Sequence, residues 1–204
     1  MTDSPLIRPA RPDDAPLAAV TFRLSMGEFA DHLFGHDGRA AEIALMKLFS
    51  RNAGRFGYEH ASVIEHHKRA LGMLIAIPGR DINRLGFASA RFLPMAFGWN
   101  MFGFIARSLS FASIHEAEAD EYYISNLAVL PAAHGQGYGP RLLTHADEQA
   151  RTRGLSKVSL LVSPANKTAL RLYKKHGFEI VSTNEHKNPI ASYHRMVKKL
   201  NPLL

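Results

Sequence analysis

Three glycines at every second position, Gly135, Gly137 and Gly139, are the residues of this chain whose spacing best suits binding chemistry. They belong to the segment His134-Gly135-Gln136-Gly137-Tyr138-Gly139. Because glycine has no Cβ, such a segment can fold tightly and aim several backbone N–H groups at one anion. An amphipathic helix is predicted from Pro140 onward, and the positive end of its dipole would face the same anion. The spacing predicts a phosphate-binding loop, with an ordinary glycine-rich turn as the alternative.

Two well-known phosphate loops do not fit this spacing. A nucleoside-triphosphate loop ends in Gly-Lys-Ser/Thr, whereas Gly139 is followed by Pro140 and Arg141. A dinucleotide-binding loop needs its third glycine three positions after the second, and Pro140 stands there. What remains is an alternating glycine loop that follows a strand.

A second pattern, at residues 166–178, has the form Asn-x-x-Ala-x-x-Leu-Tyr-x-x-x-Gly-Phe. On a helix Asn166, Ala169 and Tyr173 share one face, and Gly177 would end that helix. Together the two patterns resemble the Gcn5-related N-acetyltransferase (GNAT) family, whose members bind acetyl-coenzyme A. The resemblance covers roughly residues 122–183.

The resemblance implies a site for acetyl-coenzyme A built from both patterns. The strand before the loop would lie beside the pantetheine arm, and the loop amides would grip the pyrophosphate. Asn166 would contact the arm or cap its own helix. The cofactor-binding residues implied in this way are Leu127, Ala128, Val129, His134, Gly135, Gln136, Gly137, Tyr138, Gly139, Arg141, Asn166 and Tyr173.

The same resemblance gives Tyr173 the catalytic role. A phenol with an ordinary pKa of about 10 can protonate a departing thiolate at neutral pH without being ionised itself. The alternative is a core tyrosine whose ring only packs beneath the second pattern.

Three positions depart from the family's commonest form. His134 replaces the usual Arg or Gln, and it either helps to hold phosphate or is an exposed loop residue. Pro140 has no N–H, so the loop has one donor fewer. Ser125 stands where many relatives carry a glutamate base, and the general base is left open among Glu121, Glu118 and His115.

Around these patterns the chain predicts an α/β (α+β) fold, a single GNAT-like domain over residues 1–204 with a mixed central β-sheet flanked by helices. Residues 122–183 form its acetyl-coenzyme A-binding core. The expected strands cover residues 6–8, 61–66, 71–77, 122–130 and 158–162, and the expected helices begin near residue 13, at residue 39 and at the two patterns.

Residues 81–120 form an insert before the cofactor-binding strand. Its Phe-rich part, residues 85–105, contains Arg91, Pro94 and the sole tryptophan, Trp99. No uninterrupted apolar run of about eighteen residues exists there, so a membrane span is excluded. We expect one or two amphipathic helices packed against the sheet, or an aromatic wall of the acceptor pocket, or a dimer surface.

Composition sets wider limits. The 204-residue chain has no cysteine, which excludes a thiol nucleophile and cysteine-ligated metal, and no metal site is expected. Its net charge of +7 would attract an anionic cofactor, but no zinc spacing or basic-aromatic stripe indicates nucleic acid. The N-terminus has no secretory signal, so a cytoplasmic location with no membrane partner is expected.

The function expected from these observations is that of an N-acetyltransferase. It would transfer an acetyl group from acetyl-coenzyme A, its cosubstrate, to a primary amine of a small molecule or peptide, directly within a ternary complex. A homodimer is possible on this reading. The alternative is a non-catalytic acetyl-coenzyme A sensor of the same fold, because function belongs to the site rather than to the fold.

Overall fold

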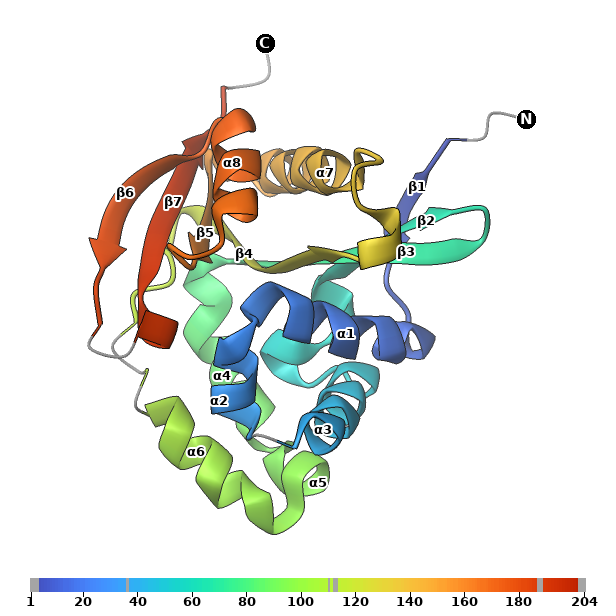
Figure 1. Cartoon of the computed structure of the whole chain (residues 1–204), viewed down its shortest axis with the longest axis vertical. Helices are drawn as coiled ribbons and strands as arrows, with labels where there is room; N and C mark the ends of the chain where they lie inside the picture. Colours follow the sequence, from blue (N-terminus) through green and yellow to red (C-terminus); the bar gives the residue numbers. More distant parts are fainter. Residues whose placement is uncertain (1–3, 36, 110, 112–113, 187–188, 202–204) are drawn as a thin grey trace.

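A seven-stranded mixed sheet forms the centre of the computed structural model, which describes residues 4–35, 37–109, 111, 114–186 and 189–201. The strand order is β1-β2-β3-β4-β5-β7-β6 (Figure 1). Only β4 and β5 pair in parallel. The strands are β1 (Leu6–Pro9), β2 (Ala61–His66), β3 (Arg69–Pro78), β4 (Glu121–Val129), β5 (Lys157–Val162), β6 (Glu179–Asn184) and β7 (Tyr193–Lys199).

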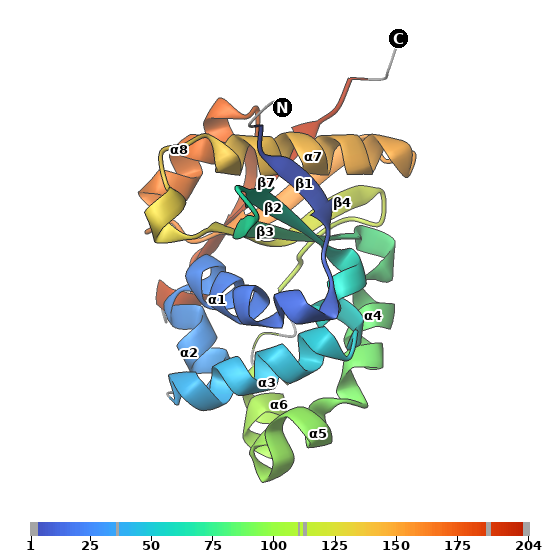
Figure 2. The same ribbon diagram turned by 90° about the vertical axis from the view of Figure 1, so that its right-hand side faces the viewer.

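Helices cover both faces of this sheet (Figure 2). One face carries the two helices of the glycine-loop and second patterns, α7 (Tyr138–Thr152) and α8 (Lys167–Lys175). The opposite face carries α1 (Ala15–Met26), α2 (Glu28–Phe34), α3 (Gly38–Ser50) and α4 (Ile82–Ala90), followed by α5 (Leu93–Phe97) and α6 (Met101–Leu109) beyond them. The fold class predicted from the sequence is therefore confirmed.

The central strand β4 is buried on both faces, which explains why its sequence is a nearly continuous apolar run. Tyr122 and Ile124 face the core beneath α7, and Tyr123 between them packs with Ile77 and Leu85 on the other face. The observed strand begins and ends one residue earlier than the predicted one. Such shifts at element ends are ordinary.

The amino-terminal helices differ from the prediction in one respect. The helix expected from near residue 13 ends at Gly27, whose φ of 56° separates α1 from α2. The next helix, α3, begins one residue before its predicted start, and Asp37 caps it by accepting from Arg39 and Ala40. Neither α2 nor strands β6 and β7 were identified from the sequence.

The insert forms three short helices, and only the first packs against the sheet. Leu85 of α4 contacts the sheet core, whereas α5 and α6 pack on α2 and α3. Phe34, Phe97 and Phe104 stack there with ring centroids 4.6 to 6.2 Å apart. Of the one or two helices expected to pack against the sheet, α4 does so, whereas α5 and α6 pack on other helices. Within the described residues, no helix has the length and apolarity needed to cross a membrane.

Candidate active site

The pairing between strands β4 and β5 ends at Ile124. Glu121 to Ile124 pair with Lys157 to Leu160, and β5 then continues along β7 alone. On its other edge β4 stays paired with β3 as far as Val129, with a bulge at Ser125. The backbone of residues 125–129 thus has a free edge toward β5 among the described strands. A free strand edge can accept an extended ligand as an added strand.

The glycine loop lies directly after this edge. A short 3-10 turn, η6 (Pro131–Ala133), leads into four exposed residues, 134–137. Gly135 and Gly137 have φ of 77° and 80°, a left-handed conformation that favours glycine. The helix α7 begins at Tyr138, two residues earlier than predicted, and no side chain of the described residues caps its N-terminus. A Cβ built on Gly135 or Gly137 would meet nothing within 4 Å, so space for an anion lies in front of the loop.

His134 is fixed to the strand rather than free in the loop. Its Nε2 lies 2.8 Å from the carbonyl oxygen of Val129. Because a carbonyl only accepts, Nε2 carries the proton and donates it. The imidazole therefore ties the loop to the end of β4, a role that neither sequence-based alternative for His134 included.

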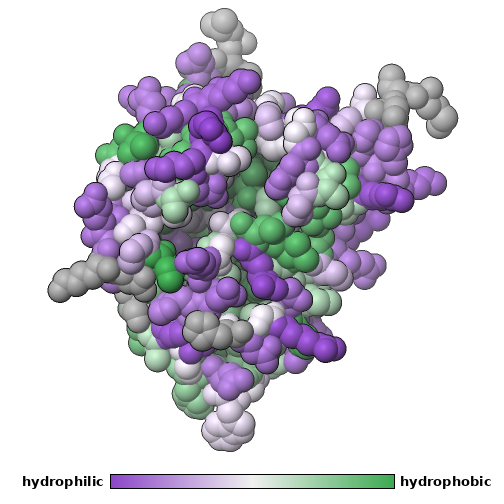
Figure 3. Space-filling view, viewed as in Figure 1, coloured by the Kyte–Doolittle hydropathy of each residue, from purple (hydrophilic) through white to green (hydrophobic). Residues whose placement is uncertain are grey.

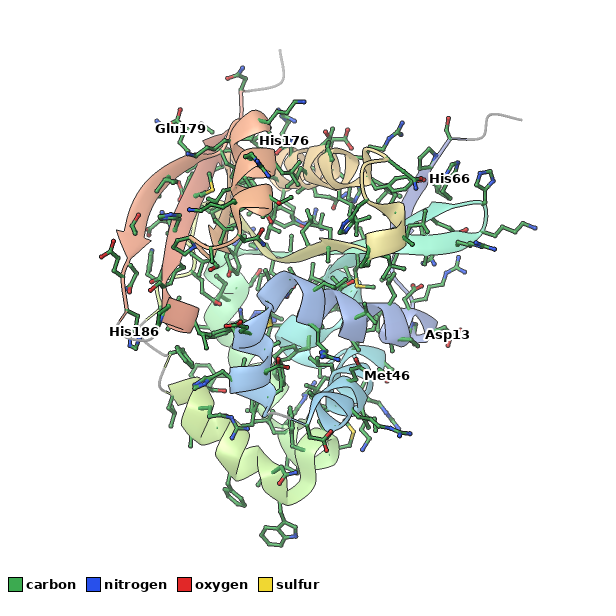
Figure 4. The ribbon with its side chains drawn as sticks, viewed as in Figure 1. Asp13, Met46, His66, His176, Glu179 and His186 are labelled. Atoms are coloured by element: carbon green, nitrogen blue, oxygen red, sulfur yellow. The ribbon has the colours of Figure 1, made fainter. Side chains whose placement is uncertain are left out.

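Tyr138 joins the loop to the β2–β3 hairpin. Its ring is buried, and its hydroxyl lies 2.7 Å from Nδ1 of His66 and 3.1 Å from Oε1 of Gln136. Figure 4 shows His66 at the hairpin end, beside the start of α7. His66 was not identified from the sequence because 72 residues separate it from Tyr138. This contact fixes the side chain of Gln136 while the backbone of the loop stays exposed.

The second pattern lies against the first. A Cβ on Gly139 would come within 3.3 Å of Cδ2 of Leu172, so glycine permits a close approach of α7 to α8. Asn166 caps α8, because its Oδ1 accepts from the N–H of Ala169 at 3.0 Å. Of the two roles expected for Asn166, the structure shows the cap. Arg141 is exposed on the first turns of α7.

Tyr173 is buried in the core cluster against which Leu127 and Val129 of the free edge pack. Its ring centroid lies 5.9 Å from that of Phe178. Burial raises the pKa of Tyr173 to about 12, which keeps the phenol protonated. Such a group can donate a proton but cannot serve as a base at neutral pH.

A polar chain reaches the bulge from the opposite face of the sheet. Ser125 Oγ donates to Asn126 Oδ1 at 2.9 Å, and Asn126 Nδ2 donates to Ser25 Oγ of α1 at 2.8 Å. Asn126 is buried, so both hydrogen bonds satisfy an otherwise costly amide. Because the single Ser125 proton is donated to Asn126, Ser125 Oγ offers only lone pairs to a further partner. The sequence did not indicate this series of hydrogen bonds, because its end residues, Ser25 and Ser125, lie 100 residues apart.

The residues considered as general base lie at the other end of β4. Glu121 is buried and ion-paired with Arg195 at 2.6 Å. Glu118 and His115 form an exposed pair at 2.9 Å. At about 3.3 Å per residue, Glu121 lies about 20 Å along the strand from Leu127. The structure does not bring these side chains to the free edge.

Comparison with known proteins agrees with this arrangement. The family model described as "Acetyltransferase (GNAT) family" matches residues 43–178, well over half of the chain. The chain belongs to the GNAT acetyltransferase family.

Among curated relatives, an 80-residue match is 39% identical to the chloroplastic GCN5-related N-acetyltransferase 6 of Arabidopsis thaliana and covers 39% of this chain and 28% of that protein. A 71-residue match is 38% identical to the [ribosomal protein bS18]-alanine N-acetyltransferase of Haemophilus ducreyi and covers 35% of this chain and 49% of the relative. The chain thus spans less than half the length of these two relatives.

A solved N-acetyltransferase from Staphylococcus aureus Mu50 superposes with a TM-score of 0.73 at 24% identity, covering 94% of this chain and 99% of that one. The ribosomal-protein-S18-alanine N-acetyltransferase of Escherichia coli superposes with a TM-score of 0.57 at 16% identity, covering 98% and 96%. At these identities the likeness shows the shared fold.

Proposed function

We propose that the chain transfers an acetyl group from acetyl-coenzyme A to a primary amine of a small molecule or peptide, directly within a ternary complex. The observation that carries this proposal is the free edge of residues 125–129, which leads into an uncapped helix N-terminus behind two left-handed glycines. The Haemophilus ducreyi relative, named as an alanine N-acetyltransferase of a ribosomal protein, supports an amine acceptor.

In this proposal residues 122–183 hold the cosubstrate. The backbone of Leu127, Ala128 and Val129 would bind the pantetheine arm along the free edge. The carbonyl oxygen of Val129 already accepts a hydrogen bond from His134. Val129 would therefore bind the arm through its N–H and through the remaining lone pair of its carbonyl oxygen. The N–H groups of residues 136–139 would bind the pyrophosphate at the positive end of α7, with exposed Arg141 adding charge nearby.

Acetyl-coenzyme A would supply the acetyl group as a thioester. The amine nitrogen would form a C–N bond as the C–S bond breaks, and Tyr173 would give its hydroxyl proton to the departing sulfur. The proton that the nitrogen loses would return to the Tyr173 phenolate through water, so that enzyme and protons balance. A phenol whose pKa is raised to about 12 is fully protonated before that step. Ser125 Oγ, with lone pairs only, would accept a hydrogen bond from the incoming amine.

The test combines binding and turnover. Calorimetry with acetyl-coenzyme A measures binding, and a thiol reagent follows coenzyme A release with a panel of small amines and short peptides. Because the chain has no cysteine, the reagent reports only the released thiol. Binding with amine-dependent release supports the proposal, and intersecting double-reciprocal lines support the ternary complex. Binding without release for any amine would favour the sensor, and the absence of binding would overturn both.

A further inference from the structure

The insert presents an unusual concentration of apolar side chains to solvent. Half of the exposed large apolar side chains among the described residues lie between residues 87 and 109. They are Phe87, Met95, Trp99, Phe102, Ile105 and Leu109. Single exposed apolar residues are common on proteins, but a cluster within one short segment indicates a binding surface.

Four of these residues form what we call the apolar tip: Trp99, Phe102, Ile105 and Leu109. On α6 the last three are three and four residues apart and share one face. Trp99 precedes them in a 3-10 turn, η5 (Gly98–Asn100), with its ring 6.2 Å from that of Phe102. Phe104 anchors α6 to the core, so the apolar face is directed outward.

The apolar tip lies at the end of the molecule remote from the candidate active site. In Figures 1 and 2 the helices α5 and α6 form the lower end, with α1 to α3 between them and the sheet. The space-filling view shows apolar, green side chains at this lower end (Figure 3). Trp99 is 88% exposed at this end of the molecule.

Within the insert, the charged residues of helices α4 to α6 are all arginine. Residues 82–109 contain Arg84, Arg91 and Arg107 and no Asp, Glu or Lys. Arg84 and Arg91 are exposed, and Arg91 lies 4.8 Å over the ring of Phe92. Trp, Phe and aliphatic residues on one face with arginine beside them are typical of helices that lie in a membrane interface.

We propose that the apolar tip docks this protein onto an anionic lipid membrane surface. The side chains of Trp99, Phe102, Ile105 and Leu109 would enter the boundary between headgroups and acyl chains. Exposed Arg91 would contact the headgroups, whereas Arg84 pairs with Asp81 and Arg107 donates to the Leu33 carbonyl. At nine residues α6 lies on such a surface and does not span it. A second copy is disfavoured as the occupant, because two chains of net charge +7 repel each other. The inference departs from the sequence-based expectation of no membrane partner and is independent of the proposed catalysis.

The test uses the full chain and its single tryptophan. Because Trp99 is the only tryptophan and lies in the tip, its fluorescence reports the tip alone. Vesicles of phosphatidylcholine mixed with an equal part of phosphatidylglycerol should shift its emission to shorter wavelength and sediment the protein. Vesicles of phosphatidylcholine alone should do so much less, and high salt should weaken the anionic binding.

The double variant Phe102→Asp with Ile105→Asp should lose partitioning by about tenfold or more, since each large apolar side chain removed from the lipid weakens binding. The matched control is Val181→Asp, because Val181 is 53% exposed against 57% for Phe102 and lies in β6, outside the tip. The control should partition like the parent chain.

Three outcomes would overturn the proposal. The first is an unchanged emission with anionic vesicles, a result on the parent chain that needs no variant to fold. The second is equal binding to neutral and anionic vesicles. The third is a lipid-free shift that grows with protein concentration together with a dimer in ultracentrifugation, which would assign the tip to a second copy.

Discussion

Replacing Tyr173 by Phe removes one hydroxyl and leaves the ring that packs 5.9 Å from Phe178. No described residue is hydrogen-bonded to that hydroxyl, and burial alone raises its pKa. The free energy of unfolding should therefore change by less than about 1 kcal/mol. The ring also keeps its place in the core cluster against which Leu127 and Val129 pack, so acetyl-coenzyme A affinity should change little.

Turnover of Tyr173→Phe should fall by about 10- to 1000-fold, or about 1.4 to 4.1 kcal/mol of transition-state stabilisation. Release of coenzyme A thiol with saturating amine measures the turnover, and calorimetry measures the affinity. The sign of the pH dependence follows from the raised pKa. Because the pKa of Tyr173 is raised to about 12, its phenol stays protonated and able to donate at lower pH. Tyr173 should therefore cause no fall in rate between neutral pH and about pH 10, the ordinary pKa of tyrosine.

The matched control is Tyr122→Phe, which alters another buried tyrosine of the same core cluster whose pKa is also raised by burial. Tyr122 lies at the start of β4, away from the free edge, so its variant should keep full turnover. A Tyr173→Phe variant that turns over within about twofold of the parent would refute the reasoning. Equal losses in both variants would point to altered packing instead.

Three further changes test other parts of the site. Gly137→Val should weaken acetyl-coenzyme A binding more than about tenfold, or about 1.4 kcal/mol, as measured by calorimetry. Gly154 is an equally open left-handed glycine at the far end of α7, so the control variant Gly154→Val should bind normally. Equal affinities of the two variants would show that the loop does not belong to the binding site. Asn126→Ala should cost about 1 to 3 kcal/mol in denaturant unfolding, because it removes the two hydrogen bonds of the buried amide to Ser25 and Ser125, and an unchanged midpoint would contradict these contacts. Glu121→Ala should cost about 3 to 5 kcal/mol by leaving Arg195 buried and unpaired, with turnover per folded molecule unchanged; a selective loss of turnover would return Glu121 to the candidates for general base.

Local patterns of the sequence were reliable where one element satisfied its own requirements. Strand β4 and helix α3 were predicted to within one or two residues, because hydrophobic periodicity and capping are properties of neighbouring residues. The helices of the insert were also expected. Their packing was not, since the apolar faces of α5 and α6 do not reveal whether the sheet, the helices α2 and α3, or solvent will cover them.

The same limit applies to single side chains of the site. The sequence placed Asn166 either against the cosubstrate or at the cap of its helix, and the cap is what the structure shows. His134 is an exposed loop residue, one of the two roles expected for it, but its hydrogen bond to the Val129 carbonyl was not expected. A side chain's partner depends on which atoms the turn brings within about 3 Å, and residue type alone does not define that.

The sequence by itself determined the family, the order of its two binding patterns and the glycines whose left-handed conformation shapes the loop. Each of these depends on spacing within one segment, where backbone sterics and helix periodicity act directly. Only the tertiary structure decided where β4 and β5 separate, that Ser25 meets Asn126 across 101 residues, and that His66 holds Tyr138. Such contacts arise because the packed sheet brings distant segments together, and no local pattern of residues encodes their distance.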